Sequence, residues 1–293
     1  MRGAVRRVGQ TMGVIVGLLA QILLAAGCSG SSTSPTPEPP PPNTPPVIKS
    51  LVASASRVEV GASVDLSATV EDLETAPDKL TYQWNAAAGT FVGEGSTVKW
   101  QAPTGVTTPA NYGISVTVIE QYQALAGRGE LTPREHRISD QVTVRVHDSR
   151  KEIGDLGLSF LTKFATSSIS PEACLVDFSD SCQGKLDELG DIRNNRERYV
   201  ILSHTLGVPR FTSLTLYTKS DMLIACAFES RIIKCSPGEV GCTVGSVERV
   251  SGDCRLTGVY EQSRWWLCVS NFFGSSTLSP TLRNFFGADV RRE

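Results

Sequence analysis

The sequence predicts a multidomain protein in which an all-β sandwich precedes an α+β cone, with helices first and a curved antiparallel sheet after them. Two observations predict this order. In residues 47–148, apolar residues recur at every second position in short runs separated by glycine and proline, which is typical of a sandwich. In residues 152–274, apolar residues recur first at helical spacing and then in long runs rich in β-branched and aromatic residues, which is typical of α+β folds.

Composition limits the class of protein. The 293 residues include 28 Lys plus Arg and 30 Asp plus Glu, which gives a formal net charge of -2. This charge produces no strong positive field, so we expect no nucleic-acid partner. Hydrophobic residues make up 40% of the chain, which is enough for packed cores in about two domains.

Residues 1–27 are predicted to be a lipoprotein signal peptide. The first residues are basic, and residues 12–26 are apolar apart from Gln21, which is the layout of a secretory signal. The apolar run is short and is followed at once by Ser and Pro. We therefore expect a processed signal and no stable membrane span.

The sequence Leu24-Ala25-Ala26-Gly27-Cys28 resembles the lipobox of bacterial lipoproteins. The resemblance implies that the Cys28 thiol receives lipid, whose acyl chains anchor the protein to a membrane. Ala25 departs from the branched aliphatic residue that is more common in the family, and cleavage by an ordinary signal peptidase after Gly27 is the alternative. Ser29 follows the cysteine, which in Gram-negative lipoproteins implies the outer membrane. We therefore expect a lipid-anchored protein of the cell envelope.

Residues 28–46 combine the predicted lipidated cysteine with a linker rich in Pro and Ser, SGSSTSPTPEPPPPNTPP. Proline favours the extended polyproline II conformation, and no residue of this segment can build a core. A spacer between membrane and domains is therefore the preferred interpretation. A recognition ligand for another protein is the alternative.

Residues 47–148 are predicted to form the sandwich. Several segments resemble an extracellular immunoglobulin-like module of the PKD type: Pro45-Pro46-Val47-Ile48, Leu80-Thr81-Tyr82-Gln83-Trp84, Gly89-Thr90-Phe91 and Val98-Lys99-Trp100. The resemblance implies a spacer or adhesion module. Residues 121–139 depart from it, because they are predicted to form a long polar loop, either a tolerated insertion or a binding feature.

Two groups of residues in this segment suggest sites, but a structural interpretation is preferred for both. Trp84 and Trp100 could stack on sugars, yet both are in phase with apolar neighbours and fit core positions. Asp72, Glu74 and Asp78 could offer oxygens to calcium, yet they lack the spacing and glycine of a calcium loop. We therefore expect a solvated acidic turn and no metal site.

Residues 152–274 begin with helical patterns. Asp155 is expected to cap the first helix, Ser170-Pro171-Glu172 to start a second, and residues 185–198 to form a third. Strands are then expected over residues 199–206, 211–218, 222–235, 246–250 and 255–272, with a break at residues 261–263.

This order resembles the NTF2-like, or SnoaL-like, cone. The most specific part is the end hairpin, Leu256-Thr257-Gly258-Val259-Tyr260 with Arg264-Trp265-Trp266-Leu267. The resemblance implies either a non-catalytic binding module or a pocket enzyme of isomerase, dehydratase or hydrolase type. His204 is the one catalytic candidate, because it is in phase with apolar neighbours that are expected to point inward, but a satisfied structural histidine is the preferred interpretation. No cofactor is expected.

Cysteines are confined to Cys28 and the C-terminal segment. Export allows disulfides, and the seven cysteines after Cys28 leave one thiol unpaired. The turn-rich stretch between Cys235 and Cys242 favours a bridge between them. The turn between Cys174 and Cys182 makes that pair the second expectation.

Residues 275–293 are expected to be a C-terminal tail, in which the sequence Asn-Phe-Phe-Gly, first present at residues 271–274, occurs again at residues 284–287. The chain contains no phosphate loop, no Gly-x-Ser-x-Gly elbow and no His-Glu-x-x-His sequence. The sequence therefore favours a membrane-anchored envelope protein that binds an envelope protein, a glycan or a small apolar ligand. A pocket enzyme and a purely structural protein are the alternatives.

Overall fold

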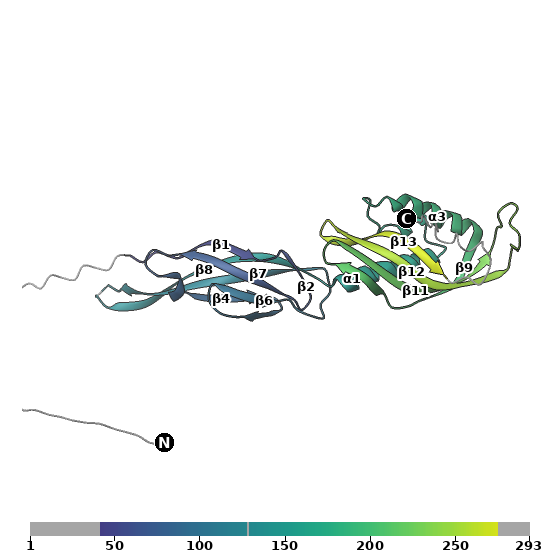
Figure 1. Ribbon diagram of the computed structural model, residues 1–293. Helices are drawn as coiled ribbons and strands as arrows, with labels where there is room; N and C mark the ends of the chain where they lie inside the picture. Colours follow the sequence, from purple (N-terminus) through teal and green to yellow (C-terminus); the bar gives the residue numbers. More distant parts are fainter. Residues whose placement is uncertain (1–41, 128, 275–293) are drawn as a thin grey trace, which may run out of the picture. The chain divides into compact units, whose positions relative to one another are not determined.

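The computed structural model describes residues 42–127 and 129–274 (Figure 1). The chain divides into two compact units, Met1–Pro41 and Pro42–Glu293, and all the described residues belong to the second. The predicted signal peptide, Cys28, most of the linker and the tail lie outside the described residues. Within the described residues, no helix has the length and apolar character needed to cross a membrane.

The N-terminal part of the described chain contains two four-stranded sheets. The first has the order β1 (Val47–Ala53), β3 (Ser63–Glu71), β6 (Thr97–Gln101) and β5 (Thr90–Val92). The second has the order β2 (Arg57–Glu59), β8 (Leu131–His147), β7 (Ala110–Leu125) and β4 (Thr81–Ala86). Neighbouring strands pair antiparallel, except that β2 pairs parallel with β8.

The two sheets share a hydrophobic core. Leu66 and Trp100 of the first sheet pack in one cluster with Ile114, Val144 and Val146 of the second, and all five are fully buried. The period-two alternation thus gives each sheet one buried face, as the sequence predicts. The assignment of these sheets to the PKD type stays a prediction.

The predicted polar loop at residues 121–139 is wrong. β7 and β8 pair without interruption from Ala110 opposite Val146 to Leu125 opposite Leu131, so the segment forms a long hairpin. Tyr122 and His136 stack across it, with ring centroids 4.6 Å apart. None of the described residues in this segment is buried, so polar residues occur at both alternating positions and hide the strand pattern.

The C-terminal part has the predicted α+β order. Its helices are α1 (Ser149–Ala165), α2 (Pro171–Cys174) and α3 (Gly184–Arg198). The strands are β9 (Tyr199–Leu206), β10 (Arg210–Thr215), β11 (Lys219–Ile232), β12 (Val247–Glu261) and β13 (Arg264–Gly274). They form one antiparallel sheet of order β10-β11-β12-β13, in which β9 also pairs with β11.

Helix α1 begins earlier than the sequence predicts, because Asp148, not Asp155, caps it. The Asp148 carboxylate accepts a hydrogen bond from the Lys151 amide at 3.0 Å, which satisfies one of the free amides at the helix start. Only Asp148 therefore separates β8 from α1. Ser170 caps α2 as predicted, through a bond from the Ala173 amide.

The first helix packs closely on the sheet. A Cβ atom at Gly157 would lie 2.4 Å from Met222 Cε and 2.9 Å from Leu256 Cδ1, so a side chain here would force these core side chains to shift. Large side chains fill the layer between the helices and the sheet. Those that are at most 2% exposed include Ile153, Phe160, Leu161, Phe178, Ile192, Met222, Ile224, Phe228, Leu256, Trp265 and Leu267.

Candidate functional site

His204, the sequence-predicted catalytic candidate, is exposed. It lies on β9 opposite Phe228 of β11, with the two ring centroids 6.4 Å apart. Paired residues of antiparallel strands share a face, so His204 lies on the same face as the buried Phe228, as the sequence phase suggests. β9 is an edge strand, which pairs only with β11 among the described strands. Within the described part of the chain, no carboxylate or hydroxyl group bonds to its imidazole.

The interior beside His204 is apolar and packed. Phe160 and Phe178 meet edge to face with centroids 4.9 Å apart, and Phe164 and Phe228 meet in the same way at 5.9 Å. A general base needs hydrogen-bond reach to a substrate proton and a partner that tunes its pKa. The aromatic layer supplies neither to His204.

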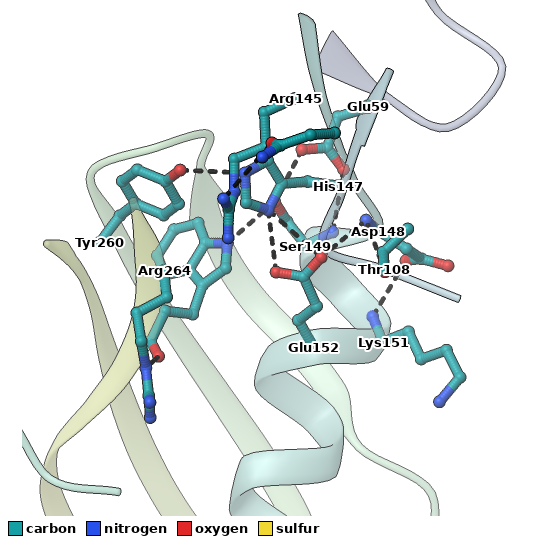
Figure 2. A network of polar contacts seen from close by, with 12 residues as sticks. Glu59, Thr108, Arg145, His147, Asp148, Ser149, Lys151, Glu152, Tyr260 and Arg264 are labelled. Atoms are coloured by element: carbon teal, nitrogen blue, oxygen red, sulfur yellow. Dashed lines mark hydrogen bonds and ion pairs between the residues drawn. The ribbon is translucent and has the colours of Figure 1, made fainter. Parts of the chain in front are cut away.

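A different histidine organises a buried polar network, which Figure 2 shows. His147, at the end of β8, is fully buried. Its Nδ1 lies 2.9 Å from Oε2 of Glu152 on α1, and its Nε2 lies 2.9 Å from the Tyr260 hydroxyl oxygen on β12. The tautomer that satisfies both contacts donates from Nδ1 to the carboxylate and accepts the tyrosine proton at Nε2.

The network continues through Ser149, the first residue of α1. Its amide and hydroxyl both donate to the Glu59 carboxylate of β2, at 2.9 Å and 2.7 Å. The Trp265 indole of β13 donates to the Ser149 hydroxyl oxygen at 2.9 Å. Strand β2, helix α1 and strand β13 therefore meet at one buried serine (Figure 2).

Aromatic rings and a cation cover one side of this network. The Arg57 guanidinium lies 4.7 Å from the Tyr217 ring centroid and 5.0 Å from that of Tyr260. Burial and the nearby Glu59 carboxylate raise the pKa of Tyr217, which keeps its hydroxyl neutral.

Electrostatics fix the charge state of the carboxylate beside His147. Burial raises the pKa of Glu152, but hydrogen bonds from His147, Thr108 and the Asp148 amide lower it by more than burial raises it. The pKa of Glu152 therefore lies below the ordinary value of 4.5. Glu152 is thus ionised near neutral pH, with several donors around it.

A carboxylate, an imidazole and a hydroxyl in line can relay protons, but this set is closed to substrates. His147 is 0% exposed, and both of its ring nitrogens form hydrogen bonds with protein groups. Such a network links elements that are far apart in sequence. Sequence reasoning missed it because the alternation of Val142, Val144 and Val146 places His147 on the opposite, outward face.

The structure contains three disulfides among the described residues. Cys235–Cys242 is the pair favoured by the sequence. The other two, Cys182–Cys268 and Cys226–Cys254, join residues far apart in the chain.

The expected Cys174–Cys182 bridge is wrong, and Cys174 is a buried free thiol. The turn of α2 directs Cys174 into the core, where its Sγ lies 3.3 Å from Nη2 of Arg196. The chain after α2 instead runs beside β13, because the Ser179 amide donates to the Leu267 carbonyl at 2.8 Å. That pairing brings Cys182 to Cys268.

The two tryptophans considered for sugar stacking differ in how deeply they are buried. Trp100 is fully buried in the core shared by the two four-stranded sheets, as the structural interpretation predicts. Trp84 is half-buried and lines a groove of about 680 Å³ together with Tyr82 and Phe91. Its indole donates to the Gly95 carbonyl at 3.0 Å.

The described residues therefore define a protein of two paired four-stranded sheets followed by an α+β part with a packed interior. Two solved structures are similar to parts of it. A candidate aromatic ring hydroxylase from Novosphingobium aromaticivorans aligns over 47% of this chain and 96% of its own, with 16% identity and a TM-score of 0.36. An NTF2-like protein involved in plasmid conjugation aligns over 59% of this chain and 76% of its own, with 10% identity and a TM-score of 0.24. No family model and no curated protein matches the chain.

Proposed function

We propose that this chain is a lipid-anchored protein of the bacterial cell envelope that binds a partner and does not catalyse a reaction. In this proposal, the PKD-like module is a spacer or adhesion module, and the C-terminal domain is an NTF2-like module for a ligand or protein partner. The outer membrane is the favoured location. An envelope protein, a glycan and a small apolar ligand are the candidate partners.

We prefer a binding role to a catalytic one because the interior of the α+β part is packed. An enzyme pocket of the NTF2-like kind needs an open cone with a base and an oxyanion partner inside it. Here Phe160, Phe178 and Trp265 fill the layer between helices and sheet. A pocket enzyme with His204 as its base is therefore the second candidate, and a purely structural envelope protein is the third.

Element order supports the NTF2-like assignment. Three helices precede an antiparallel sheet that ends in the long hairpin of β12 and β13, and this hairpin contains the sequence on which the resemblance depends. The sandwich assignment is supported by two four-stranded sheets with one shared core.

Disulfides support an exported protein. The three bridges in the described residues persist in oxidising compartments and are rare in the cytosol. This agrees with the predicted signal and with Cys28 as the lipid acceptor.

Membrane anchoring can be tested by replacing Cys28. The native chain and the Cys28→Ser variant would be expressed in a Gram-negative host that is fed an alkyne analogue of palmitate, and outer and inner membranes would be separated. We expect label and outer-membrane recovery for the native chain, and loss of label with release into the periplasm for Cys28→Ser. The matched control Cys174→Ser should keep the label. A native chain without label would overturn the anchor.

A further inference from the structure

Three oxygen atoms at one end of the sandwich are buried and have no hydrogen-bond partner. They are Oδ1 of Asn43, Oδ2 of Asp72 and Oε2 of Glu120. Asn43 precedes β1, Asp72 directly follows β3, and Glu120 belongs to β7. Buried acceptors without a partner are rare, because each loses its hydration without compensation.

These side chains form one cluster around Thr75. The Thr75 amide donates to Asp72 Oδ1 and the Thr75 hydroxyl donates to Glu120 Oε1, both at 2.6 Å. The Asn43 amide nitrogen also donates to Glu120 Oε1, at 2.8 Å. Each carboxylate therefore uses one oxygen for protein hydrogen bonds and leaves its second oxygen free, and Asn43 leaves its amide oxygen free.

The cluster lacks a balancing positive charge. Glu120 is only 1% exposed, yet neither Glu120 nor Asp72 forms an ion pair with any described lysine, arginine or histidine. The Glu74 carboxylate instead accepts bonds from the amide and hydroxyl of Thr44. A buried carboxylate without a cation is costly, so a bound cation would compensate both the charge and the free oxygens.

We propose that Asn43, Asp72 and Glu120 bind a calcium ion. Calcium takes carboxylate and amide oxygens in flexible geometry, whereas zinc prefers nitrogen and sulfur and magnesium demands a strict octahedron. The described residues contain no cluster of three or more His, Cys, Asp and Glu side chains suited to a metal. This site consists instead of two carboxylates and one amide oxygen.

The sequence interpretation of a solvated acidic turn therefore included only part of the site. It grouped Asp72 with Glu74 and Asp78, which are close in sequence. The structure groups Asp72 with Asn43 and Glu120, which come from different segments. A calcium ion bound there would link the chain before β1 to the end of β3 and to β7. The binding would be of the weak class, with a Kd of about 10⁻⁴–10⁻³ M, that suits extracellular modules.

Thermal unfolding of the full chain in detergent tests the site. The protein would be stripped with EDTA and measured with EDTA, with CaCl2 and with MgCl2, each salt at about ten times the upper Kd. We expect calcium to raise the Tm by several degrees and magnesium to raise it much less. Isothermal titration with CaCl2 should give one site per chain.

The Glu120→Gln variant keeps the shape of the side chain and removes its charge. We expect it to bind calcium at least tenfold more weakly (about 1.4 kcal/mol) and to be no less stable than the native chain in EDTA. Glu94→Gln, which changes an exposed carboxylate in the same sandwich, should keep the native response. No calcium shift in the native chain, an equal shift with magnesium, or a native shift in Glu120→Gln would each overturn the proposal.

Discussion

Nε2 of His147 lies 2.9 Å from the hydroxyl oxygen of Tyr260, across 113 residues of sequence. The other ring nitrogen contacts Glu152 at the start of α1. One imidazole thus joins the last strand of the paired sheets, the first helix after them and a central strand of the C-terminal sheet. We infer that this link makes the two parts of the described chain unfold together.

Removal of the tyrosine hydroxyl should weaken this link. Tyr260→Phe leaves Nε2 of His147 buried without a donor, so the free energy of unfolding should fall by about 1–3 kcal/mol. Urea unfolding followed by tryptophan fluorescence measures the change. Tyr122→Phe, on the exposed hairpin, should change the free energy by less than about 0.5 kcal/mol. Equal effects of the two changes would contradict the inferred role of the link.

Glu152 should make stability depend on acid pH. Its folded-state pKa is below the ordinary 4.5, so the ionised carboxylate stabilises the fold above that value and loses this effect as the pH falls through the folded pKa. Glu152→Gln should therefore be less stable than the native chain at neutral pH, and the difference should shrink in acid. Urea unfolding midpoints over a pH series measure this. A difference that does not change with pH would contradict the prediction.

A side chain at Gly157 should disturb the core. A methyl group there would displace the ends of the Met222 and Leu256 side chains, which are fully buried. Overpacking costs about 1–3 kcal/mol and alanine in a helix returns about 1 kcal/mol, so Gly157→Ala should destabilise the fold by up to about 2 kcal/mol. Gly190 on α3 is a matched control, because a Cβ there meets nothing within 4 Å. Gly190→Ala should instead stabilise by about 0.5–1 kcal/mol, since alanine favours helix. Denaturant midpoints of the two variants should shift in opposite directions.

The disulfides should differ in their effect on stability. Cys182–Cys268 spans 86 residues and Cys235–Cys242 spans 7, and closing the longer loop restricts the unfolded chain more. The entropy model gives a difference of about 2 kcal/mol. The double serine variant of the first pair should therefore lose more stability in urea than that of the second.

Peptide mapping after alkylation of the unfolded, unreduced protein should label Cys174 alone among the described cysteines.

Local patterns predicted much of the fold. The runs of alternating apolar residues and the helical spacing gave the order of elements, and β9 occurs over the predicted residues 199–206. The Cys235–Cys242 pair was predictable because a turn-forming stretch separates two nearby cysteines. These features depend on residues that are close in the chain.

Contacts between distant segments were not predictable in this way. The alternation of β8 places His147 outward, and only the packing of α1 and β12 against that strand end buries it. Cys182 meets Cys268 because residues 177–179 pair beside Leu267, which no spacing indicates. Asn43, Asp72 and Glu120 likewise come together only when β3 and β7 are in place.

The parallel pairing of β2 with β8 has a mechanical consequence. Arg57, Val58 and Glu59 pair with Arg145, Val146 and His147 in the same chain direction. A pulling force between the chain before β2 and the chain after β8 acts along the two strands in opposite directions. It therefore loads their hydrogen bonds in shear, all at once, whereas an unzipping force would break them one at a time.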